Sequence, residues 1–130
     1  MFRVLVIDDD QGTRDLIRYT LEAAGYAVVH ARNGRIGLET FRAEPADLII
    51  TDIIMPESDG VEVLMAIRAE APDVPVIAIS GTSQNSPFYL RLAGKLGASQ
   101  TLAKPFTSEA LLQAVDLARA AIRPSDAAQP

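Results

Sequence analysis

The sequence predicts an α/β protein in which five parallel strands alternate with helices. Short apolar runs rich in β-branched residues alternate with longer stretches of helical periodicity, a pattern typical of strand–helix–strand units around a parallel sheet. Most of these runs are apolar at every position, as strands require when helices cover both faces of the sheet. With 130 residues, 48% of them hydrophobic, the chain is long enough for one core and one domain.

The five strands are predicted where the apolar runs fall. Four of the runs are well defined, and the fifth is weaker. In chain order they are Val4 to Ile7, Ala27 to His30, Leu48 to Thr51, Val76 to Ile79 and Thr101 to Ala103.

The first two helices are predicted between the first three strands. The first ends at Gly25, which supplies the left-handed conformation common after a helix. The second opens at Asn33 and Gly34 and closes before Pro45, because proline restricts the preceding residue. Their apolar faces are Leu16, Ile17, Thr20, Leu21 and Ala24 in the first, and Ile36, Leu38 and Phe41 in the second.

Three further helices complete the pattern. The third runs from about Val61 through Leu64 and Ile67 and stops before Pro72, and the last is capped by Thr107 or Ser108. The fourth follows residues 81–87, which are rich in loop formers and are expected to be mobile. The apolar faces of the fourth and last helices are Tyr89, Leu92, Ala93 and Leu96, and then Leu111, Leu112, Val115, Ala118 and Ile122. We expect a domain over residues 1–123 and a flexible tail or linker stub over residues 124–130.

The amino-acid composition argues against several classes of protein function. The chain has no cysteine, which excludes disulfides, zinc–thiolate sites and thiol nucleophiles, and a reducing cytoplasmic location fits best. A net charge of -5 and the lack of a basic cluster argue against direct nucleic-acid binding. The apolar run that ends at Ile7 is too short for a signal peptide or a membrane span, so we expect no membrane association.

Polar residues stand where four of the predicted strands end. Asp8, Asp52, Ser80 and Lys104 each lie at or just past the carboxyl end of an apolar run. In a parallel sheet these ends share one edge, where ligands bind in open α/β folds. Asp47 precedes its strand and is therefore expected at the opposite edge.

The adjacent carboxylates Asp8 and Asp9 repel each other unless a cation lies between them. Mg²⁺ prefers oxygen ligands and usually binds through one or two carboxylates and phosphate, which suits this pair together with Asp52. The alternative is that Asp8, Asp9 and Asp10 merely cap the following helix.

The remaining polar candidates also have simpler interpretations. Lys104 can pair with a carboxylate or a phosphate, or it can be a solvated loop lysine, and its bond to Pro105 is a candidate for the cis form. Ser80 and Gly81 offer a hydroxyl and an unhindered amide for phosphate oxygens, or form a plain turn. His30, the sole histidine, ends its strand away from these residues and is read as a surface or boundary residue.

Taken together, these segments resemble the receiver domain of bacterial response regulators over about residues 2–123. Each match is weak alone, but their order and spacing are specific. The matching segments are residues 4–10 (VLVIDDD), residues 48–56 (LIITDIIMP) with Asp59 and Gly60, Ser80 with Gly81, and residues 104–106 (KPF).

The resemblance implies a flavodoxin-like, doubly wound, five-stranded parallel sheet of order 2-1-3-4-5 with five helices. It implies that Asp52 is the phosphoacceptor in a Mg²⁺-dependent reaction. Asp9 and Asp52 would bind Mg²⁺ directly, Asp8 through water, and the backbone carbonyl of Ile54 would complete the protein ligands. Ser80, the Gly81 amide and Lys104 would hold phosphate oxygens.

The resemblance also implies an output surface formed by the fourth helix, the fifth strand and the fifth helix. Ser80 and Thr101 occupy the switch positions, but Thr101 replaces a large aromatic residue, which puts coupling by a swinging ring in doubt. Ile54 cannot orient an attacking water as a polar side chain would, so we expect slow self-dephosphorylation. Thr82 is a candidate to supply some of that help.

The partners implied are a histidine kinase or histidine phosphotransfer protein and a downstream protein target, with phosphorylation-dependent homodimerisation as a further option. The chain is expected to be a stand-alone receiver that assists its own phosphorylation and is not a turnover enzyme. Two alternatives are a haloacid dehalogenase-type phosphohydrolase and a flavin-binding module. Against the first, Gly12 stands where Thr or Val belongs, and against the second, three aspartates in the first loop would repel a flavin phosphate.

Overall fold

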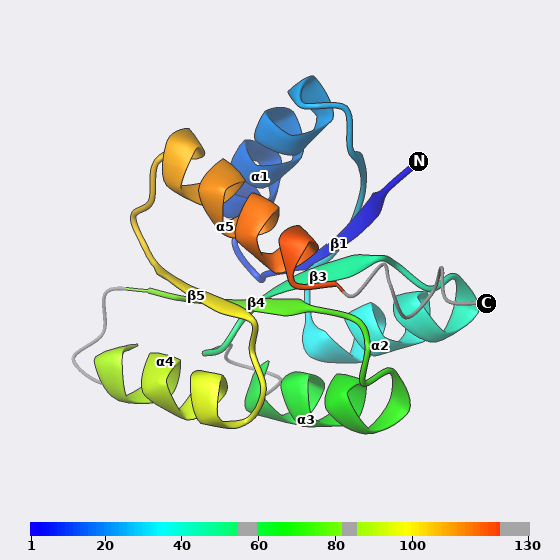
Figure 1. Cartoon of the computed structure of the whole chain (residues 1–130), viewed down its shortest axis with the longest axis vertical. Helices are drawn as coiled ribbons and strands as arrows, with labels where there is room; N and C mark the ends of the chain where they lie inside the picture. The colour runs from blue at the N-terminus through cyan, green and yellow to red at the C-terminus, as the bar shows by residue number, and fades with distance from the viewer. Residues whose placement is uncertain (55–59, 82–85, 123–130) are drawn as a thin grey trace.

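A computed structural model describes residues 1–54, 60–81 and 86–122 as a sheet of five strands between two layers of helices (Figure 1). The strand order is β2-β1-β3-β4-β5, and every neighbouring pair is parallel. This confirms the predicted fold class and strand order.

Each strand lies where an apolar run predicted it, with small differences at the ends. The central strands β1, β3 and β4 are almost wholly buried, whereas the edge strands β2 and β5 are partly exposed. Asp52 and Ser80 are the last residues of their strands rather than the first residues beyond them. The strands are β1 (Arg3–Ile7), β2 (Ala27–Ala31), β3 (Leu48–Asp52), β4 (Val76–Ser80) and β5 (Gln100–Ala103).

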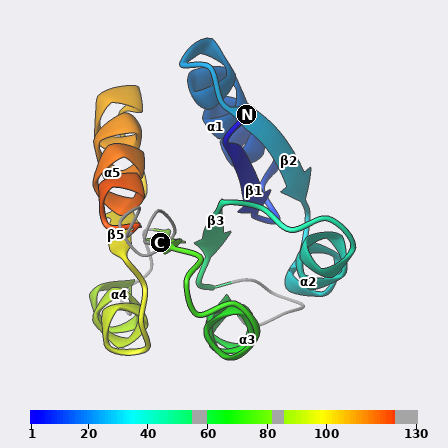
Figure 2. The same cartoon turned by 45° about the vertical axis from the view of Figure 1, so that its right-hand side comes forward.

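The helices form two layers, with α1 and α5 on one face of the sheet and α2, α3 and α4 on the other (Figure 1). Figure 2 shows α4 and α5 on either side of β5. Because β1, β3 and β4 send alternate side chains to the two faces, the core has two halves, one under each helix layer. The helices are α1 (Gln11–Ala23), α2 (Gly34–Ala43), α3 (Gly60–Glu70), α4 (Ser86–Lys95) and α5 (Ser108–Ala120).

The helix ends follow the predicted capping signals. Asn33 caps α2 by accepting a hydrogen bond from the Ile36 amide, and Thr107, one of the two candidates, caps α5. Gly25 follows α1 with φ of 96°, a left-handed conformation that favours glycine.

Three details of the predicted apolar faces are wrong. Ala24 is exposed and follows the last residue of α1. Leu16 is 42% exposed, because the buried stripe of α1 is formed by Ile17 and Leu21. Ile122 lies beyond the last residue of α5, so it does not extend the apolar face of that helix.

The strand register brings the carboxyl ends of four strands level with one another. Ile7 of β1 is opposite Thr51 of β3, and Asp52 is opposite Ile79 of β4. Ser80 is opposite Ala103, the residue before Lys104. The polar residues at these ends therefore meet at one edge of the sheet, as predicted.

Two expectations concern segments outside the described residues, namely the mobility of residues 81–87, most of which are not described, and the tail over residues 124–130. Within the described residues, none of the helices has the length and apolar character needed to cross a lipid bilayer.

Gly37 provides a test of how tightly α2 packs on the sheet. A Cβ atom at Gly37 would lie 2.4 Å from Cδ1 of the fully buried Ile7, whereas nothing lies within 4 Å of a Cβ atom at Gly94 of α4. Helix propensity alone favours alanine over glycine by about 1 kcal/mol, but overpacking a core costs about 1–3 kcal/mol. We expect Gly37→Ala to lower the free energy of unfolding in urea and Gly94→Ala to preserve or raise it. A Gly37→Ala protein as stable as Gly94→Ala would contradict this packing.

Candidate functional site

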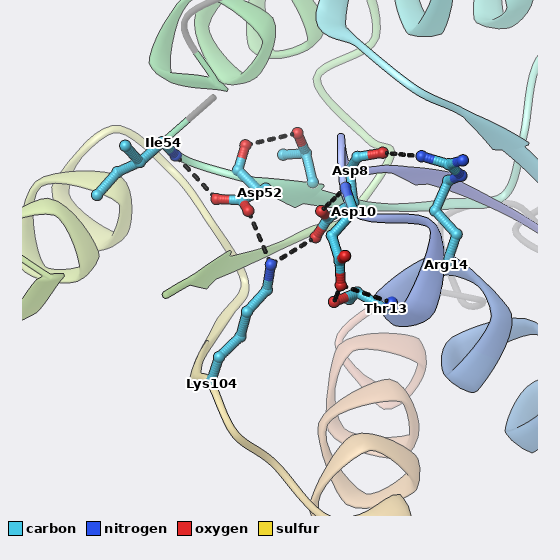
Figure 3. A network of polar contacts seen from close by, with 8 residues as sticks. Asp8, Asp10, Thr13, Arg14, Asp52, Ile54 and Lys104 are labelled. Carbon is cyan, nitrogen blue, oxygen red and sulfur yellow. Dashed lines mark hydrogen bonds and ion pairs between the residues drawn. The ribbon is translucent and has the colours of Figure 1, made fainter. Parts of the chain in front are cut away.

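The centre of the site is an ion-pair network in which one lysine bridges two carboxylates (Figure 3). Lys104 Nζ lies 2.9 Å from Asp8 Oδ2 and 2.9 Å from Asp52 Oδ2. Asp8 follows β1, Asp52 ends β3 and Lys104 follows β5, so the network ties together three separate strands. The predicted pairing of Lys104 with a carboxylate is therefore correct, and the interpretation as a solvated loop lysine is wrong.

Burial governs the electrostatics of this network. The Asp8 side chain is fully buried, and desolvation raises its pKa from 3.8 to about 6, against hydrogen bonds from the Asp10 amide and Lys104 that lower it. Burial by itself lowers the pKa of Lys104, but the hydrogen bonds and charges of Asp8 and Asp52 outweigh it and raise the pKa above 10.5. Lys104 is therefore charged at neutral pH.

The structure brings together the three carboxylates that the sequence assigned to a metal site. Oxygen atoms of Asp8, Asp9 and Asp52 all lie within 4.8 Å of one another. The three carboxylates and the one ammonium group, which pairs with Asp8 and Asp52, together leave two negative charges when all are ionised, and a divalent cation would balance them. The donor set consists of oxygens alone, which fits the preference of Mg²⁺.

Asp10 differs from its two neighbours because it caps α1. Its Oδ2 accepts hydrogen bonds from the Thr13 amide at 2.9 Å and from the Thr13 hydroxyl at 2.6 Å (Figure 3). The helix-capping alternative is thus correct for Asp10, and it is wrong for Asp8, whose carboxylate turns to Lys104 and the Asp10 amide.

The backbone around Asp52 is held from several sides. The Ile54 amide donates to Asp52 Oδ1 at 2.9 Å, and the Thr51 hydroxyl donates to the Asp52 carbonyl at 3.0 Å. Gly60 begins α3 directly against this carbonyl, and a Cβ atom there would lie 2.0 Å from its oxygen. Any larger residue at Gly60 would push the start of α3 away from the end of β3.

Ser80 and Gly81 lie beside Lys104, as expected. The Ser80 hydroxyl is buried without a hydrogen-bond partner in the described part of the chain, and a Cβ atom at Gly81 would meet nothing within 4 Å. The Lys104 amide donates to the Ser80 carbonyl at 2.7 Å, and the Lys104–Pro105 bond is cis. A buried hydroxyl without a partner is costly, so it indicates room for a ligand acceptor.

The residues expected outside the site are indeed outside it. Asp47 lies at the opposite edge, where its carboxylate accepts a hydrogen bond from the amide of Arg3. His30 is exposed on β2. Thr101, by contrast, was assigned to a switch position, and it is exposed on β5.

Arg14 of α1 was not predicted as part of the site. Its Nη1 donates a 2.7 Å hydrogen bond to the backbone carbonyl of Asp8 (Figure 3). A signal for it exists in the sequence, because a cation in the first turn of a helix is opposed by the helix dipole and so needs another partner.

A groove of about 360 Å³ opens beside the ammonium group of Lys104. It runs between the start of α1 and the segment that joins β5 to α5. Its lining residues are Asp10, Gly12, Thr13, Leu16, Lys104, Pro105 and Phe106.

The five-stranded order and the carboxylates paired with a lysine at the carboxyl edge are the arrangement that the resemblance to receiver domains implied. The response regulator receiver domain family matches residues 4–116, and the chain belongs to this family. The resemblance drawn from the sequence motifs is therefore confirmed, as is the main assignment to two-component signalling.

Relatives and solved structures agree with this assignment. The response regulator MprA of Mycolicibacterium vanbaalenii is 36% identical over 111 residues, which cover 85% of this chain and 47% of MprA. The chain thus spans about half the length of the curated relatives it matches. A response regulator receiver domain protein of Clostridium thermocellum has a TM-score of 0.83 at 32% identity, covering 91% of this chain and 94% of that one. The chemotaxis protein CheY4 of Vibrio cholerae has a TM-score of 0.81 at 32% identity, covering 91% and 98%.

The raised pKa of Asp8 predicts a pH dependence of stability. Unfolded Asp8 ionises above about pH 3.8 and folded Asp8 only above about pH 6, so the folded state holds an extra proton between these values and loses stability as the pH rises through them. In metal-free buffer, the free energy of unfolding of Asp8→Asn minus that of the wild type should rise by roughly 1–3 kcal/mol from pH 4 to pH 7.

Asp10→Asn serves as the control for this measurement. Hydrogen bonds from Thr13 lower the pKa of Asp10, so the wild-type protein gains stability when Asp10 ionises. The free energy of unfolding of Asp10→Asn minus that of the wild type should therefore fall as the pH rises. Urea denaturation at several pH values measures both. A flat or falling profile for Asp8→Asn would refute the role assigned to burial.

Proposed function

We propose that the chain accepts a phosphoryl group on Asp52 from a phosphohistidine of a histidine kinase or histidine phosphotransfer protein, with Mg²⁺ as cofactor. The observation that carries this proposal is the Lys104 ammonium group, held 2.9 Å from both the Asp52 and the Asp8 carboxylates in a largely buried cleft. This arrangement is what an anionic nucleophile needs to approach an anionic phosphoryl group.

The groups around Asp52 have different roles in the phosphoryl transfer. The Ile54 amide binds Asp52 Oδ1, and this hydrogen bond with the Lys104 ion pair orients the carboxylate for attack on phosphorus. The bond between phosphorus and the donor histidine nitrogen breaks as the Asp52 oxygen bonds to phosphorus. Lys104, the Ser80 hydroxyl and the Gly81 amide then receive the phosphoryl oxygens.

Mg²⁺ supplies positive charge to the transferring oxygens when it is bound. Asp9 and Asp52 would hold it directly, Asp8 through water, and the backbone carbonyl of Ile54 would be a further ligand. The closeness of the three carboxylates and the all-oxygen donor set support this assignment.

The groove beside Lys104 is the proposed entry for the donor histidine. Leu16 is 42% exposed at its wall, and Phe106 forms another part of the lining, so the groove offers apolar contacts next to the charged centre. An imidazole ring, with apolar faces and a phosphoryl group at its edge, suits such a surface.

The proposed output surface consists of α4, β5 and α5, with Ser80 and Thr101 at the switch positions. The Lys104 amide donates a hydrogen bond to the Ser80 carbonyl, so movement of Ser80 toward a phosphoryl group would also move the end of β5. Thr101 carries no ring, so this backbone link is the proposed route in place of a swinging aromatic side chain. A downstream protein, or a second copy of the chain, would bind this surface in the cytoplasm, with no direct role for nucleic acid or membrane.

The assignment of Asp52 predicts a simple labelling result. Incubation with acetyl phosphate and Mg²⁺ should add one phosphoryl group to the wild-type protein in an intact-mass measurement, and omission of Mg²⁺ or the substitution Asp52→Asn should abolish it. Asp47→Asn is the matched control, because it makes the same change at the opposite edge of the sheet and should leave labelling intact. Continued release of phosphate over many turnovers by Asp52→Asn would instead favour a phosphohydrolase.

Ile54 predicts a long-lived phosphorylated form. Its side chain is 38% exposed at the site and carries no group that can orient an attacking water. Substitution Ile54→Asn should speed the loss of phosphate on the order of 10-fold, since positioning a water contributes less than a full general base. Thr82, the other candidate for this task, lies outside the described residues. Decay of labelled protein measures the rate, and a wild-type half-life of seconds would defeat the prediction.

A further inference from the structure

Arg14 stands out as a partly buried cation that the ion-pair network of the site does not use. Its guanidinium reaches back from the first turn of α1 to the end of β1, where Nη1 donates to the Asp8 carbonyl at 2.7 Å (Figure 3). Its Nε is buried without a hydrogen-bond partner among the described residues. The helix dipole disfavours a cation at this position, and the unpaired Nε adds a desolvation cost. The hydrogen bond to the Asp8 carbonyl forms in spite of these two unfavourable contributions.

The bonded carbonyl belongs to the peptide that joins Asp8 to Asp9. The other polar groups of Asp8 are already held, since its amide donates to Ala31, its Oδ1 accepts from the Asp10 amide and its Oδ2 pairs with Lys104. Arg14 therefore completes the fixation of Asp8 through its carbonyl.

Asp9 depends on this peptide more than its neighbours do. Its side chain is exposed and makes no hydrogen bond or ion pair within the described residues, so only its backbone directs it toward Asp8 and Asp52. Because a peptide unit is planar, fixing the direction of the Asp8 carbonyl also fixes the plane from which the Asp9 side chain departs.

We propose that Arg14 is a positioning residue for Mg²⁺, which it serves by orienting the Asp8–Asp9 peptide so that the Asp9 carboxylate faces Asp52. The proposal rests on the Mg²⁺ site proposed above and adds a residue that touches neither the metal nor the phosphoryl group. Outer groups that orient metal ligands change metal affinity substantially when they are removed.

Charge alone makes the opposite prediction. Arg14 is a cation close to a cation site, so its removal should tighten Mg²⁺ binding if its effect were only electrostatic. Positioning predicts weaker binding. The sign of the change therefore separates the two roles.

The experiment is a Mg²⁺ titration followed by amide chemical shifts, with thermal unfolding of each protein in parallel. Arg14→Met keeps most of the apolar stem and loses the donor, and it should raise the Kd for Mg²⁺ about 10-fold. Arg18→Met is the matched control, since it removes the same charge one turn further along α1. Among the described residues, Arg18 pairs with Glu22 alone. The Kd of this variant should stay within about twofold of the wild-type value, because an exposed charge is screened by solvent.

The outcomes are distinct. Unchanged or tighter Mg²⁺ binding by folded Arg14→Met overturns the positioning role and leaves the proposed function standing. Absence of Mg²⁺ binding by the wild type overturns both. Should Arg14→Met fail to fold, Arg14→Gln provides the same test with a polar end group, and the Kd must again rise.

Discussion

The ion pairs of Lys104 with Asp8 and Asp52 are the interaction on which the rest of the site depends. Two carboxylates buried at the ends of neighbouring strands would repel each other strongly, and removing one partner from such a buried network leaves a charge without compensation. The lysine lowers the pKa of Asp8, but desolvation outweighs it and keeps that pKa raised, so burial still penalises the ionised form of Asp8. The site is therefore held in an electrostatically unsatisfied arrangement, which suits a centre that binds a cation and then a phosphoryl group.

Sheet topology makes this arrangement possible with a short chain. The strand order sets β1, β3, β4 and β5 side by side, so Asp52 and Lys104, which are 52 positions apart in sequence, meet although β4 separates their strands. Gly60 adds a constraint of its own, since only a residue without a side chain allows α3 to start against the Asp52 carbonyl. The fold thus brings the site residues to one edge of the sheet, and a few backbone contacts fix their placement there.

Much of this architecture follows from sequence pattern, because buried parallel strands are apolar throughout and their ends are marked by polar residues. The residues gathered at the edge and the separation of Asp47 from Asp52 were predictable on that basis, whereas the strand order followed from the resemblance to receiver domains. What was missed or left open depends on side-chain direction within one or two turns. Leu16 has the right spacing for the core yet is exposed, Asp10 turns to cap its helix, and Arg14 reaches back to a carbonyl. Spacing alone does not distinguish these cases, since it does not show that Leu16 lies off the buried stripe or that a local hydrogen bond turns Asp10 and Arg14 toward the backbone.

Two of the buried polar atoms that lack a hydrogen-bond partner among the described residues, the Ser80 hydroxyl and the Arg14 Nε, differ in what could satisfy them. The Ser80 hydroxyl is unpaired at the spot where phosphoryl oxygens are proposed to lie, so a ligand would satisfy it. The Nε of Arg14 belongs to a guanidinium whose Nη1 donates to the Asp8 carbonyl and so fixes a backbone direction. The energetic cost of leaving this Nε unpaired therefore persists whether or not a ligand is bound. Folding stability alone would favour neither group in these positions. Both follow from the need for a rigid frame around a pocket that is complete only when its ligands are bound.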